Sequence, residues 1–511
     1  MNDLFVNRRR LFLTLLSLAA CLVFLFSYAD RTLILTRKDY SGQRVALRDF
    51  PYPYRAMAAL VNDCDNLTPR AFERYHRFLN TRGQTIYGEG LGLDVSDSFF
   101  AYTAAPDYSR VMTYFSGLDP DSEKDARRIL RFYNAGWIDA VHALGDFSQS
   151  AGAASTGGVF TRELAVRAFD AFSRAGIYPA VWTDHGNEGN TQNFGSYGPF
   201  QSSRYKRGDD IYDAGSYHTD AAIGGGIKYV WDSDYCSRFG FDFPLTAKTL
   251  RDGRKVWAFS RFTGGGNKAG NGGGGANAYI GGGDGNPGKY GDGGSGGNEG
   301  VGGKNSDEIA ETAANKNATA RTNAYAGANA YAGGSGGRVW DWYPDRLRYE
   351  ITPGRLAELA EKRQYGLFAQ HLGFYGEDYV FEPEDVAALR LLSEYQYGRG
   401  AVLVAGSARL LEYAAARRFA CYRASRSRAG DCIEIDIVSI DDPLFPDSAP
   451  SISRLRGLTF YCDDPESVRL SVNGTRVAES ETVRNAPDET GRPSISVRWH
   501  PADYTDYTIY G

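Results

Sequence analysis

Short apolar runs alternate with amphipathic segments along most of the chain. The run from Ala56 to Val61 has the length of a buried strand, and Thr68-Pro69 behind it provides an N-cap and a first helical position. Comparable strand and helix patterns follow each other up to residue 404. This alternation predicts an α/β fold whose parallel strands form an open sheet or a (β/α) barrel.

Further elements of this pattern are predicted from the same signals. The strands are expected at 140–144, 177–182, 226–231, 256–259, 366–371 and 401–404, and the helices at 161–175, 356–362 and 382–397. Gly176 is expected to cap the helix 161–175 at its carboxyl end.

Strict alternation of apolar and polar residues begins near residue 431 and predicts a different architecture. The segments 433–437, 458–461, 468–472 and 494–499 read as short strands, and Asn473-Gly474 is a hairpin signal. We expect a small all-β, sandwich-like domain here, which either binds glycan or is structural.

Two regions fall outside the globular pattern. Residues 263–337 are rich in Gly, Asn and Ala and carry almost no large aliphatic side chains, so a disordered insertion is expected. The second region is apolar: three arginines at 8–10 precede a run from Leu11 to Ala29, which is long enough to cross a membrane as a helix.

We interpret this run as an uncleaved signal anchor that places the body of the protein outside the cytoplasm, in the periplasm or at the cell surface. A cleaved signal peptide and a lipoprotein site ending at Cys21 are alternatives with the same topology. The predicted organisation is an anchor at 1–29, a spacer at 30–50, a barrel at 51–262 and 338–420, an insertion at 263–337 and a β domain at 431–511.

Charge and cysteine usage exclude some classes of function. The net charge is −5 with nearly balanced signs, so nucleic acid is not an expected partner. The six cysteines form no CxxC pair, which argues against a zinc ribbon or a thioredoxin-like site. Cys421 and Cys432 either close a short disulfide loop or are separate buried thiols.

Histidine and aspartate recur where the predicted strands end. His142, His185, His218 and His371 lie at or after such ends, whereas His76 is expected on a helix surface. Asp63 and Asp65 alternate along one extended segment, so both can face one side. Imidazole and carboxylate ligands suit a Zn²⁺ ion with an open position for water.

These segments resemble the NodB-homology polysaccharide deacetylases, carbohydrate esterase family 4. Asn62-Asp63-Cys64-Asp65 is similar to the family's first motif, although the two aspartates are not adjacent. The stretch from His142 to Asp146 keeps the spacing of the family's two metal-binding histidines, with Asp in the second place. The segment around His371 is similar to the late motif that supplies the catalytic acid, and no clear Arg-x-Pro-Tyr motif is present.

The resemblance implies a metal-dependent hydrolase that removes acetyl groups from a polysaccharide. Asp63 or Asp65 would be the base, with Asp63 preferred, and His371 would be the acid. The divalent metal, expected to be zinc, would be held by residues from the set Asp65, His142, Asp146 and His185. The residues expected to contact the sugar are Trp182, Asn187, Asn190, Trp231 and Asp232.

Two other functions fit the same residues. Asp63, Asp65, Asp232 and Asp234 offer carboxylate pairs for a glycoside hydrolase that needs no metal. The substitutions in both metal motifs also suit a non-catalytic glycan-binding protein on a degenerate deacetylase barrel.

Overall fold

The computed structural model describes residues 38–39, 45–104, 110–147, 160–186, 190–195, 206–231, 236–264, 342–427, 432–446 and 449–509. All of them belong to one compact unit. The predicted anchor, and the predicted insertion beyond Gly264, lie outside these residues. Within the described part of the chain, no helix has the length and apolar character needed to span a membrane.

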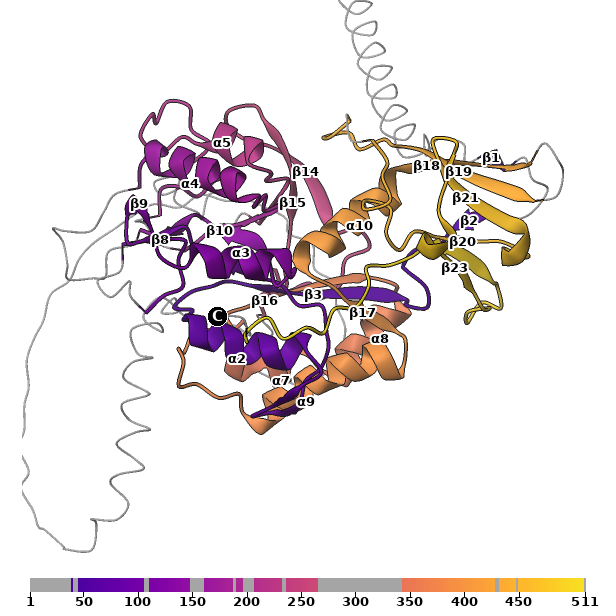
Figure 1. Cartoon of the computed structure of the whole chain (residues 1–511), viewed down its shortest axis with the longest axis horizontal. Helices are drawn as coiled ribbons and strands as arrows, with labels where there is room; N and C mark the ends of the chain where they lie inside the picture. Colours follow the sequence, from indigo (N-terminus) through magenta and orange to yellow (C-terminus); the bar gives the residue numbers. More distant parts are fainter. Residues whose placement is uncertain are drawn as a thin grey trace, which may run out of the picture. The chain divides into compact units, whose positions relative to one another are not determined.

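A nine-stranded sheet forms the centre of this unit (Figure 1). Eight strands follow the order β14-β15-β13-β12-β10-β6-β3-β16, and β17 pairs with β3. The strands are β3 (Ala56–Asn62), β6 (Asp97–Phe99), β10 (Ile138–His142), β12 (Val181–Thr183), β13 (Tyr229–Trp231), β14 (Leu245–Thr249), β15 (Lys255–Phe259), β16 (Tyr365–Gln370) and β17 (Val402–Val404). Every pairing is parallel except that of β14 with β15, so the predicted α/β architecture is confirmed.

The sheet is curled into a half-barrel, and the chain just beyond β15 reaches β16. Phe262 forms an isolated bridge with Phe368. The amide of Phe262 donates to the carbonyl of Leu367 at 2.6 Å, and the amide of Ala369 donates to the carbonyl of Phe262 at 2.9 Å. The curled sheet is the part of the predicted barrel that the strand pairing establishes.

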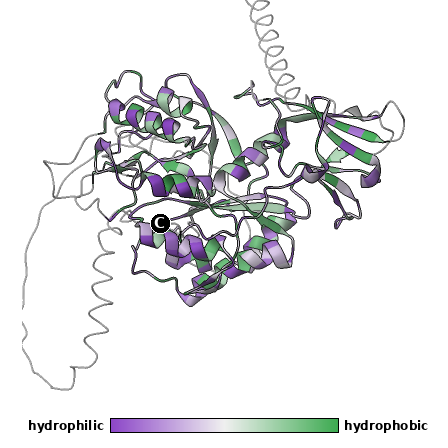
Figure 2. Cartoon of the chain, viewed as in Figure 1, coloured by the Kyte–Doolittle hydropathy of each residue, from purple (hydrophilic) through white to green (hydrophobic). Residues whose placement is uncertain are grey.

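Helices flank the sheet and bury one face each. They are α2 (Pro69–Asn80), α3 (Ala126–Asn134), α4 (Arg162–Ala175), α5 (Thr219–Gly224), α7 (Leu347–Glu350), α8 (Pro353–Glu361), α9 (Pro383–Ser393) and α10 (Ser407–Phe419). The hydroxyl of Thr68 accepts the amide of Ala71 at 3.1 Å, and Gly176 ends α4 with φ 77°, so both predicted caps are confirmed. In Figure 2 these helices carry hydrophilic and hydrophobic residues side by side.

The prediction that His76 lies on the surface is wrong. His76 is fully buried on α2, on the same face as Phe72 and Leu79. Its Nδ1 lies 3.0 Å from Oδ1 of Asn80, and its Nε2 lies 3.4 Å from Asp97. The spacing of three and four residues from these apolar neighbours places His76 on the buried stripe of the helix.

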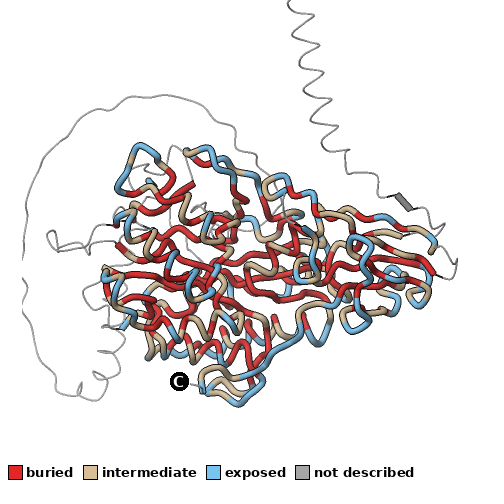
Figure 3. Tube along the Cα trace, turned by 45° about the horizontal axis from the view of Figure 1, so that its top comes forward, coloured by how far each residue is buried: buried red, intermediate tan, exposed pale blue. Residues whose placement is uncertain are grey.

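Both faces of the central strand β3 are buried. Ala58 and Leu60 belong to one apolar cluster, which includes residues of α2, α3, α4 and α9. Met57 and Val61 belong to a second cluster, which continues through α10 into the C-terminal strands. Figure 3 shows the buried trace running through the strands, with exposed residues concentrated in the outer turns.

The C-terminal residues form two further sheets with the orders β1-β18-β19-β21-β22 and β2-β20-β24-β23. Their strands are β1 (Lys38–Asp39), β2 (Ala46–Leu47), β18 (Ala420–Arg426), β19 (Ile433–Ile440), β20 (Thr459–Tyr461), β21 (Val468–Val472), β22 (Thr475–Arg476), β23 (Thr482–Asn485) and β24 (Ser494–Val497). Asn473 and Gly474, with φ 49° and 72°, form the predicted hairpin turn between β21 and β22. A separate all-β domain stays a prediction, because β1 and β2 come from the opposite end of the chain.

Short elements complete the described structure. The two-stranded pairs are β4 (Gln84–Thr85) with β5 (Gly88–Glu89), β7 (Tyr102–Thr103) with β11 (Gly145–Asp146), and β8 (Phe115–Ser116) with β9 (Asp119–Glu123). Single helical turns are η2 (Pro344–Arg346), η3 (Glu394–Gly398), η4 (Pro465–Ser467) and η5 (Glu479–Glu481). Cys421 and Cys432 are free thiols, so the disulfide alternative is wrong.

A buried arginine joins the two ends of the described chain. The guanidinium of Arg48 lies 3.0 Å from the carboxylate of Asp488, which is 440 residues away in sequence. Arg48 also donates to the carbonyls of Phe50 at 2.9 Å and Pro53 at 3.1 Å. Since a buried guanidinium needs a partner, these contacts fix the segment that leads into β3.

Candidate metal centre

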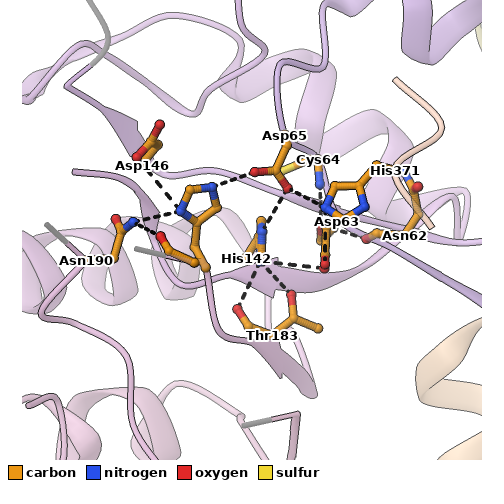
Figure 4. A network of polar contacts seen from close by, with 12 residues as sticks. Asn62, Asp63, Cys64, Asp65, His142, Asp146, Thr183, Asn190 and His371 are labelled. Atoms are coloured by element: carbon orange, nitrogen blue, oxygen red, sulfur yellow. Dashed lines mark hydrogen bonds and ion pairs between the residues drawn. The ribbon is translucent and has the colours of Figure 1, made fainter. Parts of the chain in front are cut away.

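Side chains from four neighbouring strand ends converge at one edge of the curled sheet (Figure 4). Asp63 and Asp65 follow β3, His142 ends β10, His185 follows β12 and His371 follows β16. Parallel strands place their carboxyl ends on the same edge, which explains why residues far apart in sequence meet. The predicted recurrence of site residues at strand ends is confirmed for His142, His185 and His371. It is wrong for His218, which is fully buried at the start of α5 and contacts the carbonyl of Ser216 at 2.8 Å.

The two aspartates reach the site by a turn and not by strand alternation. The strand β3 ends at Asn62, and the backbone of Asn66 has φ 54° in the turn that follows. The carboxylates of Asp63 and Asp65 both point toward the histidines in Figure 4. Asp63 and Asp65 therefore face the same side as expected, but a turn brings them there and not an extended segment.

Asp65, His142 and His185 form the first group that can hold a metal ion. Their potential ligand atoms all lie within 4.8 Å of one another. The Nε2 of His142 is 3.2 Å from Oδ2 of Asp65, and the Nε2 of His185 is 2.5 Å from Oδ1. One carboxylate oxygen therefore faces each imidazole.

His142 is held in the tautomer that metal binding requires. Its Nδ1 lies 3.0 Å from the carbonyl oxygen of Thr183 and 2.8 Å from the Thr183 hydroxyl. Because a carbonyl only accepts, Nδ1 carries a proton, and Nε2 is the nitrogen that faces Asp65 and can serve as a ligand. Phe100 stacks on the ring at 5.3 Å with an interplanar angle of 7°.

His185 is anchored by the buried amide of Asn190. The Asn190 oxygen accepts the amide of Phe147 at 2.8 Å, so its nitrogen faces Nδ1 of His185, also at 2.8 Å. Burial disfavours a charged ring, but the Asp65 carboxylate outweighs burial and raises the pKa of His185 to about 9. Because the nitrogen of Asn190 donates to Nδ1, the Nε2 of His185 carries a proton that faces Asp65, and binding of a cation through Nε2 displaces that proton.

Asp63, Asp65 and His371 form a second group, and it already contains a cation. Arg261, which is 0% exposed, donates from its two terminal nitrogens to the Asp63 carboxylate at 3.0 and 2.5 Å. The guanidinium lies 3.5 Å from the centre of the Trp231 ring. Burial alone would raise the pKa of Asp63, but Arg261 and the two nearby histidines hold it below its ordinary value.

His371 lies between both carboxylates with a fixed ring orientation. Its Nδ1 donates to the carbonyl of Trp342 at 3.1 Å. Its Nε2 lies 3.2 Å from Oδ2 of Asp65 and 3.8 Å from Oδ2 of Asp63. Burial would lower the pKa of His371, but Asp65 and Asp63 raise it, so the ring retains a proton on the side that faces the site.

The first group fits a divalent cation and the second does not. The first group offers two imidazoles and one carboxylate, a ligand set that zinc and other transition metals accept. In the second group the guanidinium of Arg261 neutralises Asp63 and would repel an added cation at short range. We therefore assign the candidate metal position to Asp65, His142 and His185.

Asp146 does not complete either group of ligands. Its Oδ1 lies 3.8 Å from Nδ1 of His185, and its side chain is 29% exposed. Of the two residues considered for the third ligand position, the structure brings His185 and not Asp146 together with Asp65 and His142.

Three of the residues predicted to contact a sugar are buried among protein atoms. Trp182 is 0% exposed, stacks on Phe194 and donates from its indole to Asp184 at 2.9 Å. Asn190 is equally buried, and one face of Trp231 is covered by Arg261. These side chains support the site and do not offer a sugar-binding surface; Asn187 and Asp232 lie outside the described residues.

Sequence reasoning missed Arg261, which binds Asp63, and Thr183, which contacts His142. Arg261 follows the apolar strand β15 at the same edge as the other site residues, and this position could have indicated it. Thr183 contacts His142 through both its hydroxyl and its backbone carbonyl, and only the hydroxyl could be read from the sequence.

Comparison with known proteins adds no relative: the chain matches no protein-family model, no curated protein and no solved structure.

Proposed function

We propose that this protein is a metal-dependent hydrolase that removes acetyl groups from an extracellular or cell-wall polysaccharide. The observation that carries the proposal is the position of the group Asp65, His142 and His185 directly beside the carboxylate of Asp63 and the imidazole of His371. A cation position, a base and an acid within one buried cluster are the parts that hydrolysis of an acetyl group requires.

Zinc is the metal we propose, because two imidazoles and a carboxylate match its usual ligands and leave room for water and substrate. When bound, such an ion polarises the acetyl carbonyl and lowers the pKa of water at the site. Asp65 and His142 offer ligand atoms without rearrangement, and His185 joins them when its Nε2 proton leaves.

Asp63 is the base in this proposal. Arg261 binds both of its oxygens and keeps it ionised at neutral pH, so the carboxylate is available to accept a proton from the attacking water. Asp65 faces the imidazoles of His142 and His185, which leaves Asp63 as the carboxylate of the cluster that is not a ligand of the first group.

His371 is the acid. Water adds its oxygen to the acetyl carbon, one water proton passes to Asp63, and the bond from the acetyl carbon to the sugar nitrogen or oxygen breaks. The proton on Nε2 of His371 then goes to the leaving atom, so that the products are acetate and the free amine or hydroxyl. The hydrogen bond from Nδ1 to Trp342 keeps Nε2 directed at the reacting atoms.

We also propose a fold and a cellular location for the protein. We propose that contacts such as Phe262 with Phe368 close the curled sheet into a (β/α) barrel, and that the two C-terminal sheets act as an all-β domain. An N-terminal anchor would hold the protein outside the cytoplasm, where cell-wall polysaccharides occur.

The site supports a carboxylate-dependent glycoside hydrolase less well. Such an enzyme needs one protonated and one ionised carboxyl group. Burial opposes ionisation of both Asp63 and Asp65, but Arg261 and the histidines outweigh it and hold both pKa values below the ordinary value. Neither of these two carboxylates therefore supplies the acid, and the other two aspartates of this alternative, Asp232 and Asp234, lie outside the described residues.

The test measures metal content and acetate release together. Purified protein is loaded with zinc, dialysed and analysed by mass spectrometry, and acetate is assayed with acetylated glycans. We expect about one metal per chain and acetate release, both lost in His142→Ala and both retained in the control His500→Ala, which changes a histidine of the C-terminal segment. Acetate release that persists in chelator would refute the proposal, and glycan binding without any acetate release would favour the non-catalytic alternative.

A further inference from the structure

One buried hydroxyl contacts the peptide groups on both sides of Asp63. Ser98 lies in β6 and is 0% exposed. Its Oγ donates to the carbonyl of Asn62 at 2.9 Å and accepts the amide of Cys64 at 3.2 Å. A single side chain therefore fixes the backbone immediately before and immediately after Asp63.

The sheet needs this contact because its backbone pairing stops here. The ladder between β3 and β6 consists of the single residue pair Asn62 and Asp97. On the other side of β3, the amide of Asp63 makes its last strand contact with the carbonyl of Gln370 at 2.8 Å. Beyond this point the chain turns, and Ser98 supplies from a side chain the hydrogen bonds that a longer ladder would have made.

The side chain of Asn62 strengthens the same corner and extends it to the acid. Its oxygen accepts the amide of Leu372 at 2.7 Å, and its nitrogen donates to the carboxylate of Asp97 at 2.8 Å. Leu372 follows His371 directly, so the ends of β3, β6 and β16 are tied together beneath the site. The backbone positions of Asp63 and His371 therefore depend on one buried network.

We propose that Ser98 is a positioning residue whose hydroxyl sets the direction in which the carboxylates of Asp63 and Asp65 leave the sheet. Its effect on catalysis rests on the proposed function, but its effect on the geometry of the metal-free site does not. Ser98 acts through the backbone of Asn62 and Cys64 and is itself neither a ligand nor a catalytic residue.

Ser96 provides a matched control. It is also a buried serine, two residues earlier in the chain, and its Oγ accepts the amide of Ser407 at 2.9 Å. Ser407 begins α10, a helix that contributes no residue to the site. Ser96→Ala and Ser98→Ala each remove a buried hydroxyl that accepts a backbone amide. They differ in the backbone that loses the hydrogen bond, which is the start of α10 for Ser96 and the segment around Asp63 for Ser98.

The test uses the ring signals of the six histidines in nuclear magnetic resonance spectra of the metal-free protein. In Ser98→Ala we expect the signals of His142, His185 and His371 to shift, because Asp63 and Asp65 contact all three rings. The signals of His218 and His500 should stay in place, and Ser96→Ala should leave all five unchanged. Zinc affinity, measured by chelator competition, should fall by about 10-fold or more in Ser98→Ala only.

Two further measurements keep the test decisive if Ser98→Ala does not fold. Ser98→Cys retains a weak donor and acceptor at the same place and should give intermediate shifts. In the wild-type protein, the amide of Cys64 should exchange with solvent slowly despite lying in a turn. Unchanged histidine signals in both variants, equal shifts in Ser96→Ala, or rapid exchange at Cys64 would overturn the inference. Absence of acetate release by the wild type, with the histidine shifts present, would refute the proposed function and leave this inference standing.

Discussion

Two groups of ligand-type side chains share the carboxylate of Asp65, and they have different chemical capacities. The first adds His142 and His185, and the second adds Asp63 and His371. Both groups contain buried and partly buried side chains, and both combine imidazole with carboxylate. They differ in Arg261, whose guanidinium binds Asp63 in the second group.

This difference shows that ligand identity alone does not define a metal position. Arg261 supplies a fixed positive charge that neutralises the carboxylate of Asp63, so the second group needs no metal ion to balance its charge. Apart from its histidines, the first group contains no comparable positive charge. The same contact keeps Asp63 ionised. One arginine therefore separates the proposed cation position from the proposed acid–base pair within a continuous cluster.

The largest effect is expected from Asp65→Asn, which removes the carboxylate that both groups share. We expect zinc affinity to fall by more than the ~10–100-fold seen when residues behind a ligand are changed, and acetate release to be lost. Isothermal titration with zinc and the acetate assay check this. Retention of zinc affinity in Asp65→Asn would mean that the first group is not the metal position.

The next largest effect is expected from His371→Gln, which removes the acid but no ligand of the first group. We expect kcat to fall by about 10²–10⁴-fold while metal content stays the same. In the wild type, activity requires ionised Asp63 and protonated His371. It should therefore be lost as pH falls through the lowered pKa of Asp63 and again as pH rises through the raised pKa of His371.

If His371→Gln keeps its metal and has a normal kcat, a residue other than His371 is the acid. The loss of activity at alkaline pH should also disappear in this variant, since the second group then contains no imidazole. An unchanged loss of activity at alkaline pH would contradict the assignment even if kcat fell.

Arg261→Gln tests the separation of the two groups directly. Removing one partner of a buried ion pair costs about 3–5 kcal/mol, so the free energy of unfolding in urea should fall by that order. In the wild type, the lowered pKa of Asp63 makes its contribution to stability present above its ordinary pKa and lost as pH falls. In the variant, burial raises the pKa of Asp63, so stability should instead rise as pH falls.

The double variant Asp63→Asn with Arg261→Gln should recover much of this loss, because neither charge is then buried alone. Arg261→Gln should also allow a second cation to bind weakly beside Asp63. If the wild type already binds two metals per chain, Arg261 does not exclude a cation and the distinction between the groups fails.

The smallest effect is expected from Asp146→Asn. Since Asp146 is partly exposed and 3.8 Å from the nearest imidazole nitrogen, zinc affinity should change by less than about 10-fold. Chelator competition on Asp146→Asn and His185→Gln in parallel checks this. A larger loss in Asp146→Asn than in His185→Gln would make Asp146 the third ligand.

Local patterns predicted the strands and helices well because each depends on near neighbours in sequence. The buried strand β3, the cap at Thr68 and the turn at Asn473-Gly474 all follow from a few adjacent residues. The candidate site was partly predictable for the same reason, since polar residues that end apolar strands gather at one edge of a sheet.

The errors arose where burial depends on distant parts of the chain. Trp182 and Asn190 read as sugar-binding residues beside a Gly-rich loop, but packing by Phe194 and Phe147 encloses them. Arg261 carried no motif, and its partner Asp63 lies 198 residues earlier. His76 could have been placed correctly from the apolar face it shares on α2.

The contact between Arg48 and Asp488 has a consequence for biosynthesis. A ribosome adds Asp488 440 residues after Arg48. The strand β2 gains its partner when β20 is made, but Arg48 still lacks the carboxylate of Asp488 at that stage. Final consolidation of this corner must therefore follow the synthesis of Asp488, and a nascent or truncated polypeptide that lacks Asp488 should be a target for chaperones and proteases.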